Sequence, residues 1–166
     1  EEGTRLLNHQ HGGGYGIDKI NPLEQYETRV SDRFYTFGWS NSSGKQVPLP
    51  PAGSIGPARL STKRRRILLC CGAYPKQLVR IHFQPMPGTI ETMNAETAEF
   101  VRCSTSQNIV FRPHTANDVW GLSALLRGVR PSLSIDRSSS PSSAFASSAL
   151  VVHNYLGTSW LESMAW

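Results

Sequence analysis

The sequence has few of the features that define disulfide-bonded or membrane-spanning proteins. It contains only three cysteines, and two of them, Cys70 and Cys71, are adjacent, which is a poor framework for disulfide bonds. No apolar run approaches the roughly 20 residues of a membrane helix. Charged residues make up only 17% of the chain, which argues against a highly charged, disordered protein. We therefore expect a folded chain that does not span a membrane and that occupies a reducing compartment.

No complete catalytic motif is present either. Asn41-Ser-Ser-Gly-Lys45 matches only the end of a phosphate loop, and no Cys-x-x-Cys pair exists. His9-Gln-His-Gly-Gly-Gly14 could supply oxyanion donors in a hydrolase, but the nearest nucleophile segment, Gly157-Thr-Ser-Trp-Leu161, lacks the final glycine of an elbow. His9 and His11 could also share a metal, although no cysteine or carboxylate cluster accompanies them. The preferred interpretation is a flexible loop on a partner, with no catalytic residue, metal or cofactor.

The clearest regular pattern is a strand, a helix and a second strand. Residues 76–84 alternate between apolar and polar side chains, which is typical of a strand buried on one face. Thr89 or Asn94 can cap the helix that follows. A short apolar run at Ile109–Phe111 predicts the second strand. This order predicts a right-handed crossover between parallel strands.

Further elements are expected around this core. Ile67–Cys71 is a continuous apolar run, which suits a strand buried on both faces. Asn117-Asp118 can cap a second helix that carries apolar residues on one face, and Ala149–Val152 could add to a sheet edge. Asn21 before Pro22 predicts a short helix to Val30. The predicted fold class is therefore α/β.

Positive charge indicates an acidic partner, since the formal net charge is +5. The sharpest basic run directly precedes the apolar run at Ile67–Cys71, and four adjacent cations could neutralise several phosphates. A solvated loop is the competing interpretation. The candidate RNA-binding residues are Lys63, Arg64, Arg65, Arg66, Arg29 and Arg33.

Aromatic side chains concentrate at residues 33–39 and near the C-terminal end of the sequence. They could form a platform that stacks RNA bases. We favour anchors that are buried against a neighbouring protein or the chain's own sheet. The candidate protein-contact residues are Phe34, Tyr35, Phe37, Trp39, Trp160 and Trp166.

The composition suggests three regions. Residues 1–62 are expected to form an extended N-terminal arm with a short helix and the aromatic segment, and residues 63–130 the α/β core. Residues 131–166 are expected to form a serine-rich extension with a terminal anchor, and this serine content predicts disorder unless another molecule holds the segment.

One family resemblance rests on three stretches of the core. Lys76-Gln-Leu-Val-Arg-Ile-His-Phe-Gln-Pro-Met86, a helix that ends in Glu99-Phe-Val101, and Asn108-Ile-Val-Phe-Arg112 resemble the thioredoxin-like small proteins of the mitochondrial ribosome. The resemblance implies a small thioredoxin-like β-α-β core, and the composition adds long irregular N- and C-terminal extensions. It also implies location in the mitochondrial matrix.

The expected function is accordingly that of a non-catalytic, structural subunit of the large mitochondrial ribosomal subunit. Its partners would be ribosomal RNA and neighbouring proteins, without a small-molecule substrate. An accessory subunit of a respiratory complex is one alternative, and a subunit of another filament, such as a ciliary microtubule, is a second. A small hydrolase or redox enzyme is a third.

Overall fold

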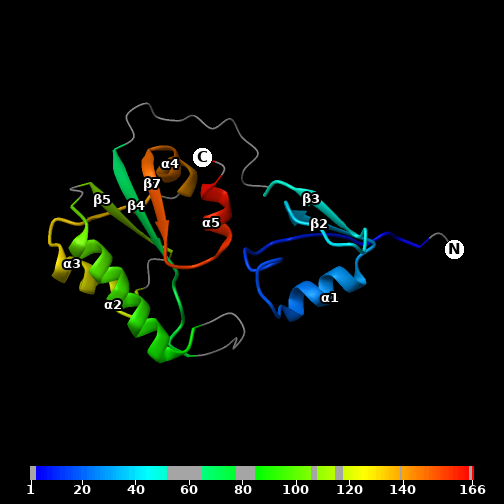
Figure 1. Ribbon diagram of the computed structural model, residues 1–166, viewed down its shortest axis with the longest axis horizontal. Helices are drawn as coiled ribbons and strands as arrows, with labels where there is room; N and C mark the ends of the chain where they lie inside the picture. The colour runs from blue at the N-terminus through cyan, green and yellow to red at the C-terminus, as the bar shows by residue number, and fades with distance from the viewer. Residues whose placement is uncertain are drawn as a thin grey trace. The chain divides into compact units, whose positions relative to one another are not determined.

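The computed structural model describes residues 3–51, 65–77, 85–105, 108–114, 118–138, 140–164 and 166 (Figure 1). The chain divides into two compact units. Residues 1–58 and 156–165 form the first unit, and residues 59–155 with residue 166 form the second. Each unit contains a parallel sheet, of three strands in the first and four in the second, so the predicted α/β class is confirmed.

The N-terminal segment, which was expected to be irregular, forms the first sheet. Strands β1 (Leu7–His9), β2 (Arg33–Phe37) and β3 (Gln46–Leu49) lie side by side in this order and run parallel. Helix α1 (Pro22–Val30) connects β1 to β2, and helix α5 (Thr158–Ser163) belongs to the same unit. The sequence did not reveal this sheet, because β1 and β3 are too short to show a pattern without their partner β2.

Helix α1 begins where the sequence predicts. The side-chain oxygen of Asn21 accepts a hydrogen bond from the Glu24 amide at 3.1 Å, and Pro22 occupies the first turn. At the other end, the Ser31 hydroxyl donates to the carbonyl of Glu27. Both ends of the helix are therefore held by side-chain hydrogen bonds.

The second sheet has the strand order β6-β5-β4-β7, and all its strands run parallel. Its strands are β4 (Arg66–Cys71), β5 (Ile109–Pro113), β6 (Ser134–Ile135) and β7 (Ser148–His153). Three helices connect them: α2 (Pro87–Cys103), α3 (Leu122–Val129) and α4 (Pro141–Ala146). The strands predicted at residues 67–71, 109–111 and 149–152 and the helix predicted from Thr89 to Val101 are confirmed within two residues at either end.

The core of the second unit lies on both faces of β4. Leu69 and Cys71 pack in one cluster with Val101 of α2, Phe111 of β5 and Leu126 of α3. Leu68 and Cys70 point to the other face and pack against Ala144 and Phe145 of α4. The continuous apolar run at Ile67–Cys71 therefore forms a strand covered on both faces, as the sequence predicts.

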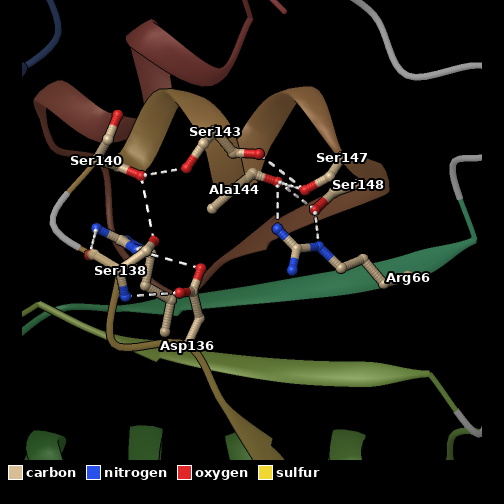
Figure 2. A network of polar contacts seen from close by, with 9 residues as sticks. Arg66, Asp136, Ser138, Ser140, Ser143, Ala144, Ser147 and Ser148 are labelled. Carbon is tan, nitrogen blue, oxygen red and sulfur yellow. Dashed lines mark hydrogen bonds and ion pairs between the residues drawn. The ribbon is translucent and has the colours of Figure 1, made fainter.

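The serine-rich segment is ordered by the chain itself rather than by another molecule. Ala144 and Phe145 are buried on β4, which gives α4 an apolar face that composition alone does not reveal. Arg66 donates to the Ser148 hydroxyl at 3.1 Å and to the Ala144 carbonyl at 3.0 Å (Figure 2). The expectation of disorder is therefore wrong for the described part of this segment.

The described residues do not show a thioredoxin-like arrangement. A strand was predicted at residues 76–84, and residues 78–84 of it lie outside the described residues. The strand that precedes α2 in the described structure is β4, which pairs with β5 on one side and with β7 on the other. Among the described residues, β1, α1, β2 and β3 lie in the segment expected to be an N-terminal arm, and α4, β7 and α5 lie in the segment expected to be a C-terminal extension.

Candidate functional site

A glycine-rich loop follows the carboxyl end of β1 in the first unit. It spans residues 10–16, Gln-His-Gly-Gly-Gly-Tyr-Gly, and leads toward α1. In open parallel α/β sheets, ligands bind outside the carboxyl ends of the strands. The loop therefore occupies the part of this sheet where a binding or catalytic site is expected.

Gln10 fixes the start of the loop to the end of β2. Its side chain is 1% exposed. Its Oε1 accepts hydrogen bonds from the Phe37 amide at 2.8 Å and from the Trp39 indole at 2.9 Å, and its Nε2 donates to the Gly12 carbonyl at 2.7 Å. One buried amide thus joins the carboxyl ends of two neighbouring strands to the glycine run.

His11 lies in this loop with its ring oriented by two other side chains. Its Nε2 lies 3.1 Å from Glu27 Oε1 and 2.8 Å from the hydroxyl oxygen of Tyr15. The Tyr15 hydroxyl donates to the second carboxylate oxygen of Glu27 at 2.9 Å. Since Glu27 accepts on both oxygens, these contacts favour the tautomer in which His11 Nε2 carries the proton and Nδ1 carries the lone pair.

Tyr15 supports this arrangement by remaining protonated. Burial, followed by the hydrogen bond and the negative charge of Glu27, raises the pKa of Tyr15 far above its ordinary value. Its ring stacks on Phe34, with centroids 6.0 Å apart, and Phe34 is fully buried. The hydroxyl of Tyr15 is therefore a fixed donor to Glu27 across the pH range in which His titrates.

Two glycines of the loop, Gly13 and Gly16, are required by close approaches. A Cβ added at Gly13 would collide with the backbone of Gly157, just before α5. At Gly16, φ is +74°, and an added Cβ would lie 2.8 Å from the Trp39 ring. The Gly16 amide donates to Glu24 of α1 at 2.7 Å. The loop is thus a tightly packed structure, and its interpretation as a flexible loop is wrong.

A match over the whole sequence identifies the family of this chain. The family model described as LIC12162 family transferase matches residues 1–166. The chain belongs to the LIC12162 transferase family. No curated protein matches the chain.

Membership of the LIC12162 family corrects the function expected from the sequence. The resemblance to mitochondrial ribosomal proteins is wrong, and so are the structural, non-catalytic role and the absence of enzymatic activity. The resemblance failed because a strand, a capped helix and a second strand are common to many α/β proteins. The expected alternative of an enzyme agrees better with the family. Location in the mitochondrial matrix stays a prediction.

The described residues include neither a membrane-spanning helix nor a metal-binding cluster. Among the helices that the structure describes, none has both the length and the apolar character needed to cross a bilayer. Within the described ranges, no group of three or more His, Cys, Asp or Glu side chains is placed to hold a metal ion. His9 lies against Phe37, with ring centroids 5.2 Å apart, whereas His11 contacts Glu27 and Tyr15.

The residues predicted to bind RNA are distributed over both units of this LIC12162 family member. Arg29 lies in the last turn of α1, and Arg33 begins β2 and donates to the Gly44 carbonyl at 2.9 Å. Arg65 is exposed, and Arg66 is bonded to α4 and β7 as described above. Lys63 and Arg64 lie outside the described residues. Contact of this set with RNA stays an untested prediction.

The aromatic residues predicted to contact proteins have various degrees of burial. Phe34 is buried inside the first unit, against Tyr15. Trp166 packs on the α4 side of the second core. The others are half-buried: Tyr35, Phe37, Trp39 and Trp160. Their contact with another protein is likewise untested.

The sequence marks His11 as a possible metal ligand and as part of a possible oxyanion stretch, and it does not single out Gln10, Tyr15 or Glu27. The available signal was the position of a glycine run after a short strand and before a capped helix. That signal was weak because β1 has only three residues. The pairing of His11 with Glu27, 16 residues later, requires the fold of the loop back onto α1.

Proposed function

We propose that this protein transfers a group from an activated donor to a hydroxyl acceptor, with His11 as the general base. The observation that carries the proposal is the pairing of an exposed histidine with a carboxylate at the carboxyl end of a parallel sheet. His11 has a side chain that is 62% exposed, whereas that of Glu27 is 21% exposed. The base is therefore accessible, and its orienting partner is largely covered.

The proton transfer follows from the tautomer. His11 Nδ1 takes the proton of the acceptor hydroxyl while the acceptor oxygen forms its bond to the transferred group. The bond from that group to the donor breaks, and the leaving group departs with the electron pair. The imidazolium that forms is stabilised by Glu27, whose carboxylate lies 3.1 Å from Nε2. This is the role of the carboxylate in a histidine-based catalytic triad.

Tyr15 and Gln10 position the base. Tyr15 donates to Glu27 and stacks on buried Phe34, so it holds the carboxylate beside His11. Gln10 precedes His11 and fixes the backbone at the start of the loop. Such supports are needed because a small displacement of a general base lowers the rate strongly.

The test compares two histidines of the same strand and loop. In the purified protein, release of the leaving group is measured with a panel of activated donors and alcohol acceptors. His11→Gln should lower kcat by about 10²- to 10⁴-fold, the usual contribution of a general base. Glu27→Gln should lower kcat less and change the pH profile.

His9→Gln is the matched control, because His9 is exposed on β1 and contacts Phe37 rather than Glu27. It should retain the wild-type kcat. Circular dichroism should show that all three variants are folded. Wild-type turnover by His11→Gln, or equal losses in His9→Gln and His11→Gln, would contradict the assignment of the base.

A further inference from the structure

A second concave site lies in the other unit, at the carboxyl ends of β5 and β6. The cavity has a volume of about 380 Å³, within the usual size range of ligand pockets. Its walls carry Arg112, Arg127 and Arg137 together with Asp118 and Asp136. Three guanidinium groups and two carboxylates thus surround one opening.

Arg112 and Asp136 neutralise each other. Arg112 lies 3.2 Å from the Asp136 carboxylate, and their side chains are only 16% and 10% exposed. Arg112 also donates to the hydroxyl of Ser138 at 2.9 Å and to its carbonyl at 3.0 Å, and the Ser138 amide donates to Asp136 at 2.8 Å. Figure 2 shows Asp136 and Ser138 within this network.

Asp136 remains ionised in this setting. Burial alone would raise the pKa of Asp136, but the hydrogen bonds from Ser138 and the positive charge of Arg112 together hold it below its ordinary value. The pair is therefore a fixed, neutral wall of the cavity. It positions Arg112 but leaves little of its charge for a ligand.

Asp118 is also engaged. Its Oδ1 accepts a hydrogen bond from the Leu122 amide at 2.8 Å, and its Oδ2 accepts one from the Ser123 amide. Both oxygens thus cap the first turn of α3, where a carboxylate is matched by the positive end of the helix. This carboxylate is directed to backbone amides rather than to an arginine.

Arg127 and Arg137 are the two cations that remain. Arg127 lies on α3, and Arg137 follows Asp136 after β6; both are exposed. In the described part of the chain, neither forms an ion pair with an acidic side chain. Guanidinium groups from two separate elements therefore face one cavity with their positive charge uncompensated.

We propose that this cavity binds the diphosphate of the donor substrate, with Arg127 and Arg137 as the ligating side chains. The planar guanidinium fork matches the geometry of phosphate oxygens. The position outside the carboxyl ends of parallel strands is the usual one for such ligands. The proposal rests on the proposed transferase function, because it identifies the leaving group as a diphosphate.

A neighbouring cavity limits what else is recognised. It shares Pro113, His114 and Asp118 with the arginine cavity, and Tyr74 and Trp120 line it. Its volume is about 30 Å³, enough for a water molecule but not for a nucleobase. The proposed ligand is therefore the diphosphate itself, which a nucleotide-linked and a lipid-linked donor have in common.

The test measures binding of inorganic pyrophosphate to the purified protein by isothermal titration calorimetry at two salt concentrations. Arg127→Gln and Arg137→Gln should each weaken binding about tenfold, and the double variant about 100-fold, as expected for loss of charged hydrogen bonds. Arg102→Gln is the control, because Arg102 is an exposed arginine of α2 that is paired with Glu99. It changes the net charge equally and should leave the affinity unchanged.

Further titrations distinguish between the possible sources of the diphosphate. ADP and UDP represent nucleotide donors, and farnesyl diphosphate represents lipid donors; tighter binding of either class than of pyrophosphate identifies the source. Absence of pyrophosphate binding by the wild type, or equal weakening by Arg102→Gln, would overturn the proposal. His11→Gln should bind pyrophosphate normally, so failure of the base assignment and failure of the diphosphate site give different results.

Discussion

Replacement of Gln10 by methionine should destabilise the first unit by about 3 kcal/mol. Methionine preserves the length of the side chain, so the change removes hydrogen bonds without opening a large cavity. Three groups lose their partner: the Phe37 amide, the Trp39 indole and the Gly12 carbonyl. Each unpaired buried group costs about 1–3 kcal/mol, and we take the lower end because Trp39 and Gly12 are only half-buried.

The assay is native-state hydrogen exchange of the β2 amides, which reports the opening of this unit separately from the second sheet. Gln25→Met is the matched control, since Gln25 is exposed on α1. It should change the free energy of opening by less than about 0.5 kcal/mol. A loss below about 1 kcal/mol in Gln10→Met would refute the reasoning that this amide holds the loop to β2.

Three other predictions concern backbone, pH and thiols. Gly38→Ala, at φ +89° with open space around it, should cost about 1 kcal/mol, whereas Gly16→Ala should cost more in urea unfolding because Trp39 blocks its Cβ. Burial lowers the pKa of His153; the folded state therefore binds fewer protons, and the free energy of unfolding should fall as the pH drops below about 6.5. This slope should be smaller in His153→Phe. Iodoacetamide should label only exposed Cys103 in the native protein and all three cysteines in urea, because the two cysteines of β4 are buried until the protein unfolds. Mass spectrometry identifies the labelled residues.

The sequence predicted the position of a helix or strand best where residues within that element determine its structure. Asn21 before Pro22 predicted the start of α1, because a cap and a first-turn proline act within four residues. The apolar run at Ile67–Cys71 predicted β4, because a strand covered on both faces needs no polar residue. The helix predicted from Thr89 begins slightly earlier, at Pro87.

Elements that depend on distant partners were missed. Strand β1 is too short to show alternation, and it is stabilised by pairing with β2. Helix α4 looked like part of a disordered serine tract, since only the burial of Ala144 and Phe145 on β4 makes it amphipathic. Both errors led to the same incorrect expectation of long irregular extensions.

The sequence by itself determined the α/β class, the positions of α1, α2, β4 and β5, and the presence of a glycine run next to a histidine, because these depend on neighbouring residues. Only the tertiary structure brought Glu27 and Tyr15 to His11, and Arg127 and Arg137 to one cavity. The physical reason is that a site is built where strands end. Which strand ends lie next to each other depends on sheet order and packing, and no local pattern contains that order.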